Sequence, residues 1–224
     1  MAKRLVFIPS RNVDEFVTQK EISFTWYSGF AKSQKLKSIR SFHEEIKKKI
    51  NIKNILEISS KSDNEIGRLA SAFNLSLFWE NSNSTIESFY QGSKVFTNGG
   101  PYTDLYDKKS IISKKDQRLK NSGDLIGFSF FNEKWSLEED FYTWLYLVSL
   151  SQNQKILENL VNYDAFTDIE FNHEKSFNCQ AYSAAFYVSL TKYKEKDLEK
   201  INIPENFKKN SPKKIIKNFQ SRLF

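Results

Sequence analysis

The sequence predicts a helix-rich α+β fold with a small sheet, built as a single domain. Two observations carry this prediction: short segments with apolar alternation come first, and segments with helical spacing dominate the second half of the chain. A length of 224 residues fits one large domain or two small ones, and 39% hydrophobic residues are enough for a sizeable core. We expect N-terminal strands packed on the core over 1–30, the main domain over 31–192, and a basic C-terminal tail over 193–224 that forms a short helix or a mobile end.

The first part of the chain predicts two strands and then a helix. Leu5 to Ile8 alternate weakly and meet Pro9, which is typical of a short edge strand. Residues 21–27 alternate more clearly, with three apolar side chains on one side. Residues 33–50 carry apolar side chains at spacings of three and four, which predicts a helix with a basic opposite face.

The middle of the chain predicts further extended segments. Residues 55–58 are almost entirely apolar and indicate a short buried strand. A polar turn is expected over 59–63, because this run is rich in serine and ends in aspartate. Small and larger side chains alternate over 69–79, so we expect extended chain there as well.

The second half predicts mainly helices. Thr85 is a suitable N-cap for a helix over 86–96, since threonine can accept a hydrogen bond from a free backbone N–H of the first turn. The Asn-Gly-Gly-Pro sequence of residues 98–101 is expected to end that helix. Similar patterns predict further helices near 110–120, 138–150, 153–162 and 176–192.

Several classes of protein are excluded by composition and motifs. A single cysteine, Cys179, rules out an intramolecular disulfide framework or a Cys-based metal cluster, and it is expected as a buried small residue. The two histidines, His43 and His173, are too few for a His-rich site. His43 falls on the apolar stripe of its helix, so we expect a core histidine with a satisfied hydrogen bond and not a ligand. Dinucleotide-binding, P-loop, nucleophile-elbow and zinc-protease motifs do not occur. Without a membrane-length apolar run or a signal peptide, we expect a cytoplasmic protein that needs neither metal nor cofactor.

The net charge of +7 is concentrated near the C-terminus. Residues 189–224 hold 10 basic and 4 acidic residues, whereas residues 1–188 hold 24 and 23. The tail and the basic face of the 33–50 helix could follow the phosphates of a nucleic acid. They could equally be solvated surface, because a lysine-rich composition is also what an AT-rich genome produces.

Residues 87–94 carry the most informative polar pattern. On a helix, Glu87, Gln91 and Lys94 fall on one face at i, i+4 and i+7, spread over about 10 Å. This face could hold a polar ligand or could simply be solvated. Gly92 costs about 1 kcal/mol relative to alanine inside a helix, so we expect a close approach there by another backbone or a ligand.

A second polar run lies over 164–170 and contains three carboxylates, among them Asp168. Its composition favours an exposed acidic loop. Asn178 follows at the expected start of the next helix, where it could act as a helix cap or contact a ligand.

These segments resemble the NADAR family of YbiA-like N-glycosidases over about residues 55–190. The resemblance rests on the order of three blocks and is closest to the NADAR antitoxins associated with DarT-type ADP-ribosyltransferase toxins. The blocks are Ile58-Ser59-Ser60 with Leu69 to Asn74, Ile86 to Phe96 with Gly99 to Tyr106, and Asp164 to Asp168 with Asn178.

The resemblance implies a NADAR fold and an enzyme that hydrolyses the bond between ADP-ribose and the guanine amino group of nucleic acid. It implies catalytic roles for Glu87, Lys94 and Asp168, and it requires no metal. The expected substrate-binding residues are Ser59, Ser60, Lys61, Ser71, Phe73, Asn74, Tyr90, Gln91 and Asn178. The functional partner would be a DarT-type toxin, and we expect a monomer without membrane contact.

The chemistry leaves some roles open. Cleaving a ribosyl C–N bond develops positive charge at the anomeric carbon, which carboxylates such as Glu87 and Asp168 can stabilise. Lys94 could neutralise a phosphate, or attack the ring-opened sugar as an amine if burial lowers its pKa. Two other functions remain open: an N-glycosidase of a small phosphorylated ribosylamine, and a non-catalytic antitoxin that binds nucleic acid or a toxin.

Overall fold

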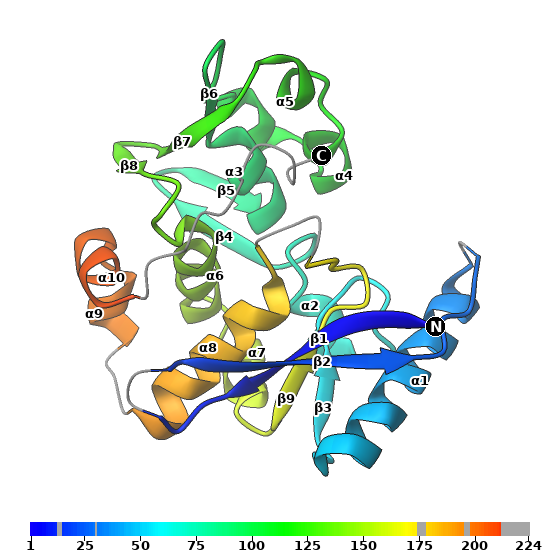
Figure 1. Cartoon of the computed structure of the whole chain (residues 1–224). Helices are drawn as coiled ribbons and strands as arrows, with labels where there is room; N and C mark the ends of the chain where they lie inside the picture. Colours follow the sequence, from blue (N-terminus) through cyan, green and yellow to red (C-terminus); the bar gives the residue numbers. More distant parts are fainter. Residues whose placement is uncertain (13–14, 30, 174–177, 195–197, 212–224) are drawn as a thin grey trace. The chain divides into compact units, whose positions relative to one another are not determined.

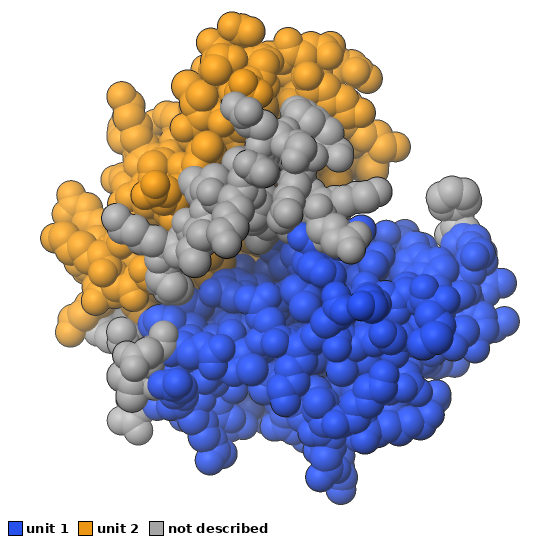
Figure 2. Space-filling model, viewed as in Figure 1, with its two compact units in different colours: residues 1–71, 153–196 blue, residues 72–152, 197–224 orange. Residues whose placement is uncertain are grey.

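The computed structural model describes residues 1–12, 15–29, 31–173, 178–194 and 198–211. The chain divides into two compact units, coloured separately in Figure 2. Unit 1 contains residues 1–71 and 153–196, and unit 2 contains residues 72–152 and 197–224. Both units combine helices with small sheets (Figure 1), so the predicted α+β class is confirmed. Among the described residues, no helix is both long and apolar enough to cross a membrane.

Unit 1 is organised around a four-stranded mixed sheet. The strand order is β2-β1-β9-β3, and the two central strands, β1 and β9, are antiparallel to each other. β3 runs parallel to β9, so the carboxyl ends of these two strands lie at the same edge. The elements of the unit are β1 (Ala2–Pro9), β2 (Val17–Phe24), α1 (Lys32–Ile50), β3 (Ile55–Glu57), α2 (Glu65–Leu69), α7 (Gln154–Leu160), β9 (Ala165–Thr167) and α8 (Gln180–Tyr193).

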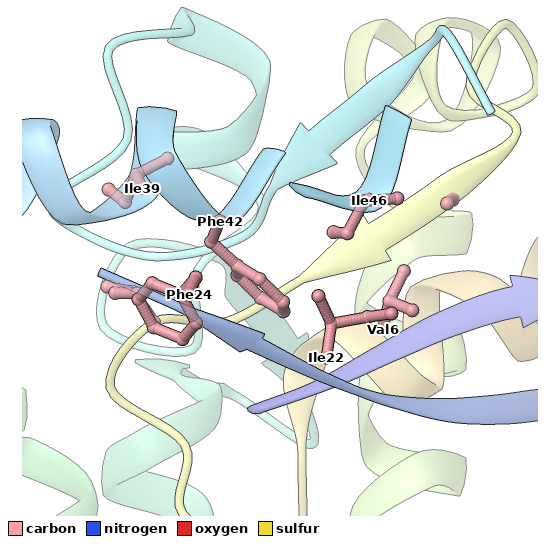
Figure 3. Packing of buried hydrophobic residues seen from close by; sticks show 8 residues of the cluster. Val6, Ile22, Phe24, Ile39, Phe42 and Ile46 are labelled. Atoms are coloured by element: carbon pink, nitrogen blue, oxygen red, sulfur yellow. The ribbon is translucent and has the colours of Figure 1, made fainter. Parts of the chain in front are cut away.

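Helices cover both faces of this sheet, since successive apolar side chains of its strands point to opposite faces. Val6 of β1 belongs to the core beneath α1, where Ile39, Phe42 and Ile46 point toward the strands (Figure 3). Phe7, the next residue along β1, faces the other way, and its ring lies 6.0 Å from that of Tyr182 on α8. The predicted helix over 33–50 is confirmed by α1.

Two predictions for unit 1 are wrong. β1 is a central strand, not an edge strand, because it pairs with β2 on one side and β9 on the other. The segment before β4 (Ser76–Trp79) is not extended: α2 ends at Leu69 and turns follow. After α2, the backbone N–H and the hydroxyl of Ser71 both donate hydrogen bonds to the carbonyl of Arg68, and this local turn overrides the alternation.

Unit 2 packs helices and two small antiparallel sheets around an aromatic core. The ring of Phe130 lies within 5.9 Å of the rings of Phe89, Phe141 and Trp144. The elements are β4, β5 (Ser82–Thr85), α3 (Ile86–Gly92), β6 (Lys94–Phe96), the 3₁₀ helix η1 (Thr103–Asp107), α4 (Ser110–Lys114), α5 (Arg118–Asn121), β7 (Leu125–Phe130), β8 (Glu133–Trp135), α6 (Phe141–Ser151), α9 (Leu198–Asn202) and α10 (Pro204–Asn210).

The later helices are largely where the sequence predicts them. α4, α5, α6 and α7 fall in or near the three predicted helical ranges between residues 110 and 162. α8 begins at Gln180, and residues 174–177 of the predicted 176–192 helix lie outside the described residues. Part of the tail is helical, as α9 and α10, and Phe207 of α10 is buried. Residues 212–224 lie outside the described residues.

The helix predicted over 86–96 is confirmed at its start and wrong at its end. Thr85 accepts a hydrogen bond from the backbone N–H of Ser88, as predicted for an N-cap. The helix stops at Gly92, and Lys94 to Phe96 form strand β6, which pairs with β7. Pairing with a strand distant in sequence therefore overrides the local helical pattern.

Gly67 offers a direct test of the packing in unit 1. A Cβ atom at this position would lie 2.0 Å from the carbonyl oxygen of Glu57 and 2.7 Å from Oγ of Ser62. Gly67→Ala should therefore lower the free energy of unfolding by about 1–3 kcal/mol, although alanine usually stabilises a helix by up to about 1 kcal/mol. Chemical denaturation measures this change, with Glu65→Ala, an exposed position on the same helix, as the control. A variant as stable as the control would contradict the packing.

Candidate active site

Helix α3 is held in place by small polar residues that contact η1 and α4. Oγ of Ser88 donates a hydrogen bond to the carbonyl of Lys108, and Oγ of Ser93 lies 2.9 Å from the hydroxyl of Tyr106. At Gly92, a Cβ atom would lie 2.6 Å from the Tyr106 ring and 2.9 Å from the carbonyl oxygen of Tyr102. The close approach predicted at Gly92 is confirmed.

Glu87, Gln91 and Lys94 form a buried polar cluster in unit 2, here called the Glu87 cluster. Their exposed fractions are only 6%, 7% and 7%, so the alternative of a solvated face is excluded. Nε2 of Gln91 donates a hydrogen bond of 3.0 Å to Oε1 of Glu87. Lys94 lies beyond the helix on β6, so its predicted place on the same helical face is wrong.

One polar atom of the Glu87 cluster has no hydrogen-bond partner. Oε1 of Gln91 is buried and accepts no hydrogen bond from the described residues. A buried amide oxygen without a donor lowers stability by about 1–3 kcal/mol, so an unsatisfied group of this kind calls for an explanation. A bound ligand with an N–H or O–H group would supply the missing donor.

Lys94 is the second unusual group of the cluster. Its Nζ lies 5.0 Å from the centroid of the Tyr90 ring, and no ion pair within the described chain holds it. Burial lowers the pKa of Lys94 to about 8; the Glu87 carboxylate opposes this shift, and the charge of Lys114 adds to it. An amine with this pKa is partly unprotonated near neutral pH, as a nucleophilic lysine must be.

The other predicted residues of unit 2, Tyr90, Phe73 and Asn74, differ in how deeply they are buried. Tyr90 is buried, and its ring packs against those of Phe128 and Tyr142 at 5.4 and 5.1 Å. Phe73 is half-buried, and Nζ of Lys114 lies 5.0 Å from its ring centroid. The same Nζ lies 3.9 Å from Oε1 of Glu87, so Lys114 joins Phe73 to the Glu87 cluster. Asn74 is exposed.

A second polar group lies in unit 1 at the carboxyl ends of the parallel strands β3 and β9. Ligands often bind at this edge of a sheet. Asp168 follows β9, and the turn beginning at Ser59 comes just after β3. Nε2 of Gln180 connects the two strand ends by donating hydrogen bonds to the carbonyl of Ile58 and to Oδ2 of Asp168.

The prediction of an exposed acidic loop at this position is wrong. Residues 165–167 form the fully buried strand β9, and Asp168 is only 7% exposed. The segment is buried because it fills the gap between β1 and β3, pairing with both. Burial, and then the charge of Glu57, raise the pKa of Asp168 to about 7, although hydrogen bonds from Gln180 and Glu170 oppose the shift.

Glu57 is a buried carboxylate that the sequence prediction missed. It accepts hydrogen bonds from the hydroxyl of Thr167 at 2.6 Å and from the backbone N–H of Ile169 at 2.8 Å, the residues on either side of Asp168. A glutamate inside the apolar run 55–58 is the sequence signal that could have revealed it. Gln180 and Lys114, also missed, carry no comparable signal.

His43 completes a hydrogen-bonded chain with Glu57. Its Nε2 lies 2.8 Å from Oγ1 of Thr167, and Thr167 uses its only proton to donate to Glu57. When Glu57 is ionised, the Nε2–H tautomer of His43 completes this chain, and burial lowers the pKa of this histidine to about 4. The interpretation of His43 as a core histidine with a satisfied hydrogen bond is confirmed. Cys179 is buried just before α8, and burial raises the pKa of its thiol.

The remaining predicted residues of unit 1 lie around the strand ends or in nearby turns. Ser59 is buried and accepts a hydrogen bond from the N–H of Lys61, whereas Ser60 is exposed. The hydroxyl of Ser71 donates to the carbonyl of Arg68. The predicted site residues thus fall into two groups: Ser59, Ser60, Lys61, Ser71, Asp168 and Asn178 in unit 1, and Phe73, Asn74, Glu87, Tyr90, Gln91 and Lys94 in unit 2.

Unit 2 also contains a cavity of about 350 Å³ that includes none of the predicted residues. It is lined by Ser82, Pro101, Thr103, Tyr106, Asp107, Ser129 and Phe131. Across the described ranges, no group of three or more His, Cys, Asp or Glu is placed to hold a metal ion.

The raised pKa of Asp168 predicts a pH dependence of stability. Its folded-state pKa of about 7 exceeds its ordinary value of 3.8, so the folded protein binds this proton more tightly. The resulting stabilisation is fully present below pH 4 and is lost as the pH rises through 7. We expect the free energy of unfolding to fall less steeply for Asp168→Asn than for the wild type between pH 4 and 8. Denaturant titrations across this range measure the difference, and parallel curves would contradict the burial of an ionisable Asp168.

One comparison with known proteins gives a match over nearly the whole chain. A family model described as "DarT1-associated NADAR antitoxin" matches residues 2–220. This range extends beyond the 55–190 covered by the motifs and includes the strands of the N-terminus and helices α9 and α10. No curated protein matches the chain.

Proposed function

The chain belongs to the family of DarT1-associated NADAR antitoxins, and on this premise we propose that it is a hydrolase of guanine-linked ADP-ribose. The proposed substrate is nucleic acid in which ADP-ribose is joined to the exocyclic amino group of guanine. Hydrolysis of this N-glycosidic bond would restore the guanine. The protein would thereby reverse the modification made by a DarT-type toxin.

The Glu87 cluster is the observation that carries this proposal. It combines a buried carboxylate, a buried amide oxygen without a donor, and a lysine with a lowered pKa. Buried polar and charged groups of this kind cost stability, and perturbed titratable groups gather at active sites. The same residues lie between Ile86 and Phe96, in one of the three blocks on which the resemblance to NADAR proteins rests.

The pKa of about 8 supports a nucleophilic role for Lys94. In the ring-opened sugar, the anomeric carbon is doubly bonded to the guanine nitrogen. The unprotonated Nζ of Lys94 adds to this carbon, and the guanine nitrogen leaves as an amine after gaining two protons. The carbon remains bound to Nζ as an imine, and water then adds to it, releases ADP-ribose and restores the amine.

Glu87 would move the protons of this reaction. Its carboxylate can accept the protons that Nζ loses during attack and deliver them to the departing guanine nitrogen. It would then activate the water that hydrolyses the imine. The hydrogen bond from Gln91 keeps the carboxylate in a fixed orientation. For Asp168 we keep the role that the resemblance implies, a second carboxylate, and its pKa of about 7 suits a proton donor.

The test compares two substrates and measures released ADP-ribose. One is an oligonucleotide carrying a single guanine-linked ADP-ribose, and the other is the corresponding free nucleoside. We expect turnover of the oligonucleotide with a higher kcat/KM. Exclusive turnover of the small substrate would favour the ribosylamine N-glycosidase instead. No release from either substrate by the folded protein would overturn the proposal and favour a non-catalytic antitoxin.

A further inference from the structure

Residues 108–120 form a strongly basic segment of unit 2, here called the lysine segment. It contains six basic residues and one acidic residue, a local excess of five charges. Arg118 is neutralised by ion pairs with Asp104 and Asp116 at 2.7 and 2.9 Å. Five lysines are left, and Lys114 near Glu87 is the only one of them with a carboxylate of the described chain within 4.0 Å.

The basic residues of α1 and α10 are paired to a greater extent. On α1, Lys35 pairs with Glu170 and Arg40 with Asp63, and both Lys48 and Lys49 contact Glu45. On α10, Lys208 pairs with Glu133. The basic α1 face and the described part of the tail are therefore less available to a polyanion than their composition suggests.

The lysine segment is firmly anchored to the rest of unit 2. Oγ of Ser110 donates to the carbonyl of Phe73, and Oγ of Ser113 donates to the carbonyl of Leu105. Leu119 is buried. The lysines are exposed, so the segment is an ordered surface with its charges directed to solvent.

Lys114 connects this surface to the Glu87 cluster. Its Nζ lies 3.9 Å from Oε1 of Glu87 and 5.0 Å from the ring centroid of half-buried Phe73. Two apolar residues of the segment, Ile111 and Ile112, are also exposed, at 48% and 53%. A site for single-stranded nucleic acid combines lysines that bind phosphates with neighbouring apolar and aromatic groups that contact bases.

We infer that the lysine segment is the docking surface for the single strand that carries the modified guanine. Its lysines bind backbone phosphates without reading sequence, as point charges do. Because Lys114 lies near both Glu87 and Phe73, a nucleic-acid strand held along residues 108–120 passes next to the Glu87 cluster. This inference rests on the proposed function for the identity of the base, but the binding of the strand does not depend on catalysis.

The test reverses three exposed lysines outside the Glu87 cluster. The variant K109E/K115E/K120E is compared with K32E/K37E/K47E, a matched triple change on exposed lysines of α1. Fluorescence anisotropy with an unmodified single-stranded DNA oligonucleotide measures affinity at several salt concentrations. We expect the first variant to bind about tenfold more weakly or worse, with a salt slope smaller by about 2, because each phosphate contact contributes about 0.7. The α1 variant should bind within about twofold of the wild type.

Activity on the free ADP-ribosylated nucleoside separates the two proposals. The K109E/K115E/K120E variant should keep its kcat/KM for this small substrate and lose kcat/KM for the oligonucleotide. Equal DNA affinity of this variant and the wild type, equal losses in the two variants, or no DNA binding by the wild type would each overturn the docking surface. Weakened DNA binding in a protein inactive on both substrates would support the surface and refute the proposed function. If charge reversal prevents folding, the K109Q/K115Q/K120Q variant gives the same comparison.

Discussion

Replacing Lys94 by alanine is expected to lower the turnover of guanine-linked ADP-ribose by about a thousandfold or more. Loss of a nucleophile or of an acid–base group typically costs two to four orders of magnitude in rate. Lys94→Arg should be equally inactive, since a guanidinium keeps the positive charge but cannot act as a nucleophile near neutral pH. Single-turnover assays of released ADP-ribose measure both variants.

Two controls make the Lys94 result specific. Lys134→Ala changes an exposed lysine of β8 in the same unit and should leave turnover unchanged. Lys94→Ala should not be less stable than the wild type through the loss of charge, because burial already disfavours the ammonium form. Denaturant titration checks that both Lys94 variants are folded. If Lys94→Arg kept a tenth or more of the wild-type turnover, Lys94 would have an electrostatic role instead.

Replacing Glu57 by alanine is expected to lower the free energy of unfolding by about 2–4 kcal/mol. The change removes the acceptor for the hydroxyl of Thr167 and for the backbone N–H of Ile169, both in the buried interior of unit 1. Each buried donor left without a partner costs about 1–3 kcal/mol, partly offset by removing a carboxylate whose pKa is raised by burial. Denaturant titration measures the loss.

Glu57→Gln should retain most of the stability, within about 1 kcal/mol of the wild type. Its amide oxygen can still accept from Ile169, and its NH₂ group can donate to Oγ1 of Thr167. The Thr167 hydroxyl can then donate to Nε2 of His43, which is neutral and can change tautomer. Equal losses in the alanine and glutamine variants would show that the hydrogen-bonded chain does not stabilise unit 1.

Local patterns were sufficient to predict the elements that depend on local interactions. The spacing of three and four residues in α1 and the N-cap at Thr85 needed no knowledge of the rest of the fold. Lys94 to Phe96 continue the helical pattern of the residues before them, and they form a strand because they pair with β7. β9 is only three residues long, too short to show a clear alternation, so its central place in the sheet depends on pairing with β1 and β3.

The polar groups also divide into contacts between residues close in sequence, which are predictable, and contacts between residues distant in sequence, which are not. Glu87 and Gln91 are four residues apart on one helix, and their predicted proximity is confirmed by a hydrogen bond. Glu57 meets Thr167 across 110 positions of sequence, and Gln180 meets Ile58 across 122, so no local spacing could reveal either contact. The net charge alone likewise does not predict which lysines are available to bind a polyanion, because this depends on the ion pairs of the folded chain.

The proposed function is tested most directly by trapping the imine on Lys94. The protein is mixed with the oligonucleotide carrying guanine-linked ADP-ribose and treated with sodium borohydride, which reduces an imine to a stable amine. Intact-mass measurement and peptide mapping then locate the adduct. An imine mechanism predicts one ADP-ribosyl adduct on Lys94, absent from Lys94→Arg. Rapid release of ADP-ribose with no trapped adduct, or an adduct on another lysine, would contradict it.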